Sequence, residues 1–228
     1  MKNGKNILII LERDSISKDT DLMKYLENEL SDIGYELVFY NRIKKTQKYS
    51  NTSIFLDPTG VLSSLPRWLR RLIKACKLLR YPSRWKYFLI QRTYEESIKS
   101  RCKKFEKFVS GFGHGAHVAV LSRSAGGRVA SKVADMCNLS KIICLGYPFE
   151  HPDKRIEPDR FSHLAHLQTP FLILQGVNDA YGGRDVISKY TLSNAIQISF
   201  VETDHDFKMS QSEWNDVVIQ IKEFLSTK

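Results

Sequence analysis

Cysteine is scarce in this chain, and signs of cross-linking or of membrane anchoring are missing. The four cysteines are scattered, and none lies at the CxxC or CxxH spacing typical of a zinc site. No run approaches the ~20 consecutive apolar residues that a transmembrane helix needs. The short apolar run at the N-terminus ends at Glu12 without a small-residue cleavage site, which indicates a strand and no signal peptide. We therefore expect a cytoplasmic protein with no metal and no cofactor.

Acidic residues are missing from one long interval, between Asp57 and Glu95, although the chain holds 25 of them. The lysines and arginines of this interval account for nearly all of the net charge of +10. These basic residues are Arg67, Arg70, Arg71, Lys74, Lys77, Arg80, Arg84, Lys86 and Arg92. Apolar residues recur among them at helical spacing, which predicts an amphipathic helix with a cationic face.

Several interpretations of this basic helix stay open. It could pack on the domain with a solvated basic face, or bind an anionic membrane surface at the periphery of the bilayer. It could also bind an acidic polymer such as nucleic acid or polysaccharide, although no nucleic-acid-binding motif accompanies it. The contacts would come from Arg67, Arg70, Arg71, Lys74 and Lys77. As an insertion or lid spanning 62–110, the segment could instead select an anionic substrate.

The rest of the chain alternates short apolar runs with helical patterns, which predicts three layers with a mostly parallel central sheet. With 228 residues and 42% hydrophobic content, the chain suits a single domain over 1–228. The predicted strands are 6–11, 35–40, 117–121, 141–145, 171–175 and 196–201. The predicted helices are 19–33, 85–110, 126–137, 185–192 and 213–225.

The strongest local motif surrounds Ser124. An apolar strand runs into Ser122-Arg123-Ser124-Ala125-Gly126, and a helix starts at once. A tight strand-to-helix turn needs small residues two before and two after a nucleophilic serine, and it exposes the hydroxyl above the sheet. The same turn aims the backbone N–H of Ala125 at a developing oxyanion. The alternative is an ordinary helix N-cap, in which the serine hydroxyl accepts from a free backbone donor.

Two further residues follow later strands, in the order Ser, Asp, His that is expected of hydrolases whose nucleophile sits on a strand-to-helix turn. Asp179 comes just after a buried strand that ends in Gly176, and His205 follows the next strand. In a triad, His205 would take the proton of Ser124, and Asp179 would hold the imidazole tautomer. Taken alone, Asp179 could be a turn residue, and His205 could be a solvated loop histidine.

These segments, together with Gly146-Tyr147-Pro148, resemble the α/β-hydrolase family and are most similar to its dienelactone-hydrolase-like branch. The resemblance covers residues 116–226 well and the first 40 residues loosely. It implies an α/β-hydrolase fold in which Ser124 is the nucleophile, Asp179 the acid and His205 the base. It also implies that Ala125 contributes to the oxyanion hole.

One departure from the family pattern lies after the first strand. The branch usually has a glycine-rich loop there that supplies a second oxyanion donor, whereas this chain has Glu12-Arg13-Asp14. Losing one such donor typically costs about 3 kcal/mol of transition-state stabilisation. Arg13 could replace it with a side-chain donor, or could be a surface charge. Beside the nucleophile, Arg123 could bind an anionic substrate group or face solvent, and Tyr147 is a second candidate substrate contact.

Two classes of function follow. The first is a serine hydrolase for an ester, thioester or similar acyl bond of a small molecule, with an anionic substrate favoured by the basic residues. The second is a weakly active or inactive hydrolase-fold protein that binds an acidic partner or membrane surface through its basic segment. The Ser, Asp and His residues favour the first, because a protein free of catalytic demand has no reason to keep them in this arrangement.

Overall fold

The computed structural model describes residues 5–11, 25–26, 28–30, 32–40, 98–113, 115–153 and 155–227. All of them belong to one compact unit, formed by residues 1–40 and 98–228. Arg13 and the basic cluster from Arg67 to Lys77 lie outside the described residues, so the predictions made for them stay predictions.

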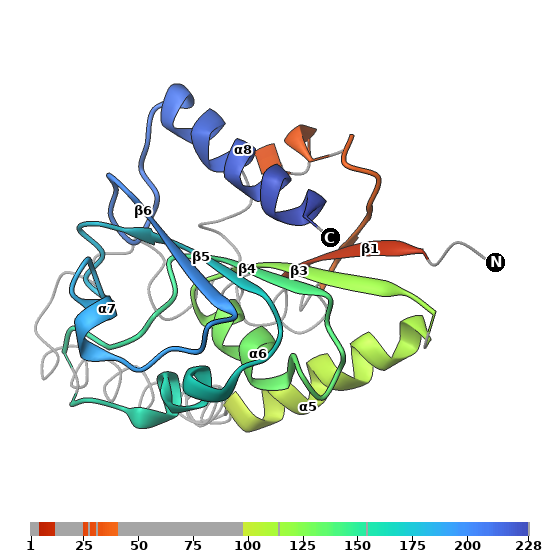
Figure 1. The fold of residues 1–228 in the computed structure, drawn as a ribbon, viewed down its shortest axis with the longest axis horizontal. Helices are drawn as coiled ribbons and strands as arrows, with labels where there is room; N and C mark the ends of the chain where they lie inside the picture. The colour runs from red at the N-terminus through yellow and green to blue at the C-terminus, as the bar shows by residue number, and fades with distance from the viewer. Residues whose placement is uncertain are drawn as a thin grey trace, which may run out of the picture. The chain divides into compact units, whose positions relative to one another are not determined.

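Six parallel strands form the sheet of this unit, in the order β2-β1-β3-β4-β5-β6 (Figure 1). They are β1 (Asn6–Leu11), β2 (Glu36–Phe39), β3 (His117–Arg123), β4 (Lys141–Leu145), β5 (Phe171–Gly176) and β6 (Ile196–Val201). The inner strands β3, β4 and β5 are almost entirely buried, as expected when helices cover both faces of a parallel sheet. Because the strands are parallel, their carboxyl ends all meet at one edge.

Helices cover the two faces of the sheet (Figure 1). On one face, α5 (Ile98–Val109) and α6 (Ala125–Val133) pack against each other. On the other lie α8 (Gln211–Ser226) and the helical residues 25–26 and 28–29. Side chains alternate along β3, so that Val118 and Val120 join the first core while Ala119 and Leu121 join the second. The short elements are η3 (Ser110–Phe112), η4 (Pro158–Arg160), η5 (Ser162–His166) and α7 (Val186–Lys189).

α5 lies within the range 62–110 that the sequence predicts as a basic insertion or lid. Arg101, Phe105 and Val109 recur every four residues and form the buried face of α5. Phe105 is fully buried in the core that α6 shares. Residues 98–109 are therefore part of a helical layer of the fold, and the remainder of the predicted segment, 62–97, lies outside the described residues.

Both ends of α8 are held by side chains. Ser210 and Glu213 form a capping box at its start, in which each side chain satisfies the other residue's backbone N–H. At its end, the Lys141 ammonium donates to the carbonyls of Phe224 and Leu225, at 2.6 and 3.1 Å. Among the helices that the structure describes, none combines the length and the apolar character that crossing a membrane requires.

Candidate active site

Ser124 occupies the turn between β3 and α6, with a strained backbone. Its φ of 47° and ψ of −117° are unusual for a residue other than glycine, and such strain is concentrated at functional sites. Ser124 stands at the N-cap position of α6, but its side chain makes no capping hydrogen bond. Its Oγ lies 2.9 Å from Nε2 of His205 instead. The structure therefore places the hydroxyl against a base and not against the helix.

Small residues around Ser124 allow the turn to close. Ser122, which stands where the usual motif has glycine, is fully buried, and its hydroxyl donates to the carbonyl of Ile143 on β4 at 2.7 Å. Gly127 packs directly on β4, because a Cβ at this position would overlap Sγ of Cys144. The helix can approach the strand this closely only because residue 127 has no side chain.

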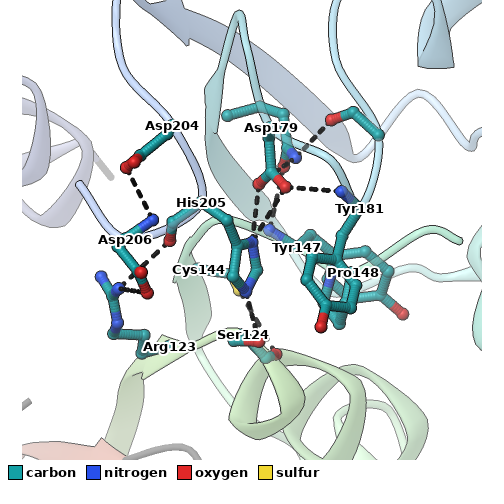
Figure 2. Close-up of polar contacts among 12 residues, drawn as sticks. Arg123, Ser124, Cys144, Tyr147, Pro148, Asp179, Tyr181, Asp204, His205 and Asp206 are labelled. Atoms are coloured by element: carbon teal, nitrogen blue, oxygen red, sulfur yellow. Dashed lines mark hydrogen bonds and ion pairs between the residues drawn. The ribbon is translucent and has the colours of Figure 1, made fainter. Parts of the chain in front are cut away.

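His205 is engaged through both ring nitrogens (Figure 2). Its Nδ1 lies 2.8 and 3.0 Å from the two carboxylate oxygens of Asp179, while Nε2 faces Ser124. The side chain of Asp179 has no exposed area, and that of His205 is 13% exposed. His205 is thus not the solvated loop histidine of the alternative interpretation. Ser124, His205 and Asp179 come from the carboxyl ends of β3, β6 and β5, or from the loops that follow them.

Asp179 is a turn residue as well as the partner of His205, so the two interpretations of this residue are compatible. One oxygen accepts from the backbone N–H of Tyr181 at 2.7 Å, which is a typical aspartate turn. The other accepts from Nε2 of Gln175 at 2.9 Å. Gln175 also donates to the carbonyl of Gly182 at 2.6 Å and accepts from the backbone N–H of Tyr147 at 2.9 Å.

Gln175 is a residue of the site that was not predicted from the sequence. The signal was present, because Gln175 is the one polar side chain in the apolar strand Phe171–Gly176 and is fully buried. A buried amide needs partners for its donors and its acceptor. Its position near the end of β5, four residues before Asp179, indicates where those partners lie.

The segment Gly146-Tyr147-Pro148 contributes to the site through its glycine and not through its tyrosine. The Tyr147 side chain is fully buried, and its hydroxyl donates to the carbonyl of Arg160 at 2.6 Å. Burial also raises the pKa of this phenol. The prediction that Tyr147 contacts substrate is therefore wrong for its side chain. Gly146 has a φ of +66°, and a Cβ there would lie 3.3 Å from both Asp179 Oδ2 and His205 Nδ1.

Arg123 does not have the accessible guanidinium that both of its predicted roles require. The residue is 1% exposed, so the solvent-facing interpretation is wrong. Its Nη2 donates to the backbone carbonyl of His205 at 3.1 Å, beneath the loop that carries the imidazole (Figure 2).

Ala125 is the first residue of α6 and follows Ser124 directly. The first N–H groups of a helix have no intrahelical acceptor, and the helix dipole makes this end favourable for negative charge. The backbone N–H of Ala125 is therefore suited to an oxyanion, and its place in an oxyanion hole stays a prediction. The second predicted donor, Arg13, lies outside the described residues.

An aromatic ring and an unreactive thiol lie next to the site. The ring of Tyr181 lies against the His205 imidazole, with ring centroids 4.4 Å apart. Burial raises the pKa of the Cys144 thiol, below Ser124, to about 12, which leaves it neutral and a poor nucleophile. Nowhere in the described ranges do three or more histidine, cysteine or acidic side chains gather as a metal site.

His163 forms a second serine–histidine contact, away from Ser124. Its Nε2 lies 2.8 Å from Oγ of Ser131 on α6. Burial lowers its pKa to about 4, and its Nδ1 is buried without a hydrogen-bond partner. This second serine–histidine pair therefore has neither the carboxylate nor the strained turn that Ser124 and His205 have.

Comparison of the sequence with protein-family models gives a match over residues 88–226, more than half of the chain, to a family described as Alpha/beta hydrolase domain. The match includes β3 to β6 and the residues from Ser124 to His205. No curated protein matches the sequence.

Solved structures of hydrolases share the fold. The metagenome-derived lipolytic enzymes LipS and LipT give a TM-score of 0.59 at 9% identity, covering 98% of this chain and 95% of that chain. A lidless serine hydrolase from Xanthomonas campestris gives 0.58 at 10%, covering 99% and 84%. A monoacylglycerol lipase from Paleococcus ferrophilus gives 0.57 at 8%, covering 97% and 95%. The predicted three-layer architecture with a parallel central sheet is confirmed.

Proposed function

Because the chain belongs to the alpha/beta hydrolase domain family and has its fold, we propose that it is a serine hydrolase that cleaves an ester, thioester or similar acyl bond. One observation carries the proposal. Ser124 Oγ lies 2.9 Å from His205 Nε2, and His205 Nδ1 lies 2.8 Å from Asp179. Ser124 itself occupies a strained turn at the carboxyl edge of the sheet. This is the geometry of a nucleophile, a base and an orienting acid.

The hydrogen bonds determine the direction of proton transfer. An ionised Asp179 can only accept, so the ring proton of His205 sits on Nδ1 and leaves Nε2 free to accept from Ser124. In the proposed reaction, Ser124 attacks the substrate carbonyl as His205 takes its proton, and the N–H of Ala125 stabilises the oxyanion. His205 then protonates the leaving group, and a water molecule, activated by the same imidazole, hydrolyses the acyl-enzyme.

We assign the substrate to the carboxylic-ester type and the chain to the dienelactone-hydrolase-like branch. Structural relatives named as lipolytic enzymes and as a monoacylglycerol lipase support an ester substrate, and the Gly146-Tyr147-Pro148 segment supports the branch. An anionic substrate, selected by the basic segment, stays part of the proposal. The alternative of a non-catalytic protein that binds a polyanion or membrane rests on residues 62–97, which the structure does not describe.

A fluorophosphonate probe tests the proposal, because it reacts covalently with an activated serine. We expect labelling of the wild-type protein and hydrolysis of short p-nitrophenyl esters, both lost in Ser124→Ala. Ser131→Ala is the matched control, since it removes a serine that also contacts a histidine but lacks the acid partner. A folded wild-type protein that the probe does not label, or equal labelling of wild type and Ser124→Ala, would refute the proposal.

A further inference from the structure

Arg123 is a buried cation directly before the nucleophile. Because side chains alternate along β3, Ser122 lies on the α6 side, whereas Arg123 follows Leu121 on the α8 side. It is 1% exposed, and it is among the largest fully buried side chains of the part of the chain that the structure describes. A charge in such a place costs free energy unless polar groups compensate it, so its partners indicate its role.

Among the described residues, three consecutive residues of the loop after β6 contact the Arg123 guanidinium. Nη2 donates to the carbonyl of His205 at 3.1 Å and lies 3.9 Å from the carboxylate of Asp206. The guanidinium carbon lies 5.5 Å from the ring centroid of Phe207, within the range of a cation–π interaction. Figure 2 shows the Arg123 side chain directed at this loop, on the opposite side of His205 from Asp179.

The loop needs such support because its backbone is unusual. Phe207 has a φ of +54°, in the left-handed region that residues other than glycine rarely adopt. Asp204 tightens the turn, since its carboxylate accepts from the N–H of Asp206 at 2.9 Å and its carbonyl from the N–H of Phe207 at 3.2 Å. A strained turn keeps its shape only when surrounding contacts determine it.

We propose that Arg123 is a positioning residue for the general base. It holds the main chain of His205 from below, while Asp179 holds the imidazole, and both are needed to keep Nε2 within hydrogen-bond distance of Ser124. The proposal rests on the proposed hydrolase function. It replaces the role of Arg123 as an anion-binding residue, because the guanidinium is buried and already donates to the loop that carries the base.

Steady-state kinetics with a neutral ester and an anionic ester of equal chain length distinguish positioning of the base from binding of an anionic substrate group. We expect Arg123→Met to lower kcat about 10- to 100-fold, the loss typical of one charged hydrogen bond, with KM changed less than twofold for both esters. Arg123→Lys, which keeps a cation, should restore part of kcat. A rise in KM confined to the anionic ester would assign Arg123 to substrate binding and overturn the proposal. The matched control is Arg128→Met, which removes an α6 arginine paired with Asp159 and should leave both constants unchanged.

Hydrogen–deuterium exchange gives a readout that does not depend on activity. The N–H groups of Asp206 and Phe207, both bonded to Asp204, should exchange faster in Arg123→Met than in wild type, while those of β5 stay protected. If the wild-type protein hydrolyses nothing but exchange rises as expected, the hydrolase proposal fails and the loop contact stands. If the wild type is active and neither exchange nor kcat changes in the variant, the positioning role is wrong. Should Arg123→Met not fold, Arg123→Lys carries the same comparison.

Discussion

Gln175 and Asp179 are joined by a hydrogen bond of 2.9 Å between a buried amide and a buried carboxylate. The amide can donate and accept at once, and the structure uses both functions, toward Asp179 and Gly182 on one side and toward the backbone of Tyr147 on the other. Gln175 therefore connects β5 to the segment after β4 and directs the Asp179 carboxylate toward His205.

Replacement of Gln175 by Glu should reduce activity strongly near neutral pH. Two adjacent buried carboxyl groups cannot both ionise readily, so one of them keeps a proton that competes for the Asp179 oxygens. We expect kcat for a p-nitrophenyl ester to fall at least about tenfold, equivalent to about 1.4 kcal/mol. Gln197→Glu, an exposed site on β6, is the matched control. Unchanged kcat in Gln175→Glu between pH 6 and 8 would show that Asp179 does not depend on this amide.

Gly146→Ala should impair both stability and catalysis. A side chain at a φ of +66° costs about 1–2 kcal/mol, and the added methyl would crowd Asp179 and His205 at 3.3 Å. We expect a lower free energy of unfolding in urea together with slower fluorophosphonate labelling of Ser124. Gly111→Ala serves as the control, because no atom lies within 4 Å of the Cβ it would add. Labelling at the wild-type rate would mean that Asp179 and His205 keep their arrangement despite the added methyl group.

Gly127→Ala tests the close packing of α6 on β4. The new Cβ would overlap Sγ of Cys144, and such overpacking typically costs about 1–3 kcal/mol. Because the severest clash is with Sγ of Cys144, Cys144→Ala should relieve most of it, so the double variant is expected to be more stable than Gly127→Ala alone. A double-mutant cycle of urea unfolding measures this coupling. Additive effects of the two substitutions would contradict the direct contact.

His163 makes stability depend on pH. Its pKa in the folded protein is lowered to about 4, chiefly by burial, from an ordinary value of 6.5. Between pH 6.5 and 4 the unfolded chain binds the His163 proton more readily than the folded protein does. The folded state therefore keeps its full stability above pH 6.5 and loses stability as pH falls toward 4. The contribution reaches at most about 3 kcal/mol, since one unit of pKa corresponds to about 1.4 kcal/mol. Urea unfolding at pH 7.5, 6 and 4.5 should show a flatter profile for His163→Gln, while His117→Gln, at an exposed site, keeps the wild-type slope.

The sheet is predictable because its strands are short segments rich in apolar residues. The predicted strands 6–11, 141–145 and 196–201 agree with β1, β4 and β6 at both ends. Helix limits were less accurate, since α6 ends at Val133 and not at 137, and α7 has four residues where 185–192 was expected. Helical periodicity continues into turns, whereas a strand ends where the apolar run ends.

In the site, the sequence predicted the residues whose roles follow from their place at strand ends. Ser124, Asp179 and His205 each follow a buried strand, and parallel strands bring such residues to one edge. The roles of Gln175, Gly146 and Arg123 were not predictable in this way. They depend on which loop closes over which side chain, a relation between segments up to 82 residues apart in the chain, as with Arg123 and His205. Nothing in the neighbouring sequence records that relation.

The three residues of the proposed triad all lie between positions 124 and 205, inside the span that the family model matches. No triad atom comes from the first 120 residues. The earlier half therefore supplies β1, β2 and α5 to the fold but none of the three proposed reacting groups. A substitution there can change the walls around the site while the proposed nucleophile, base and acid stay as they are.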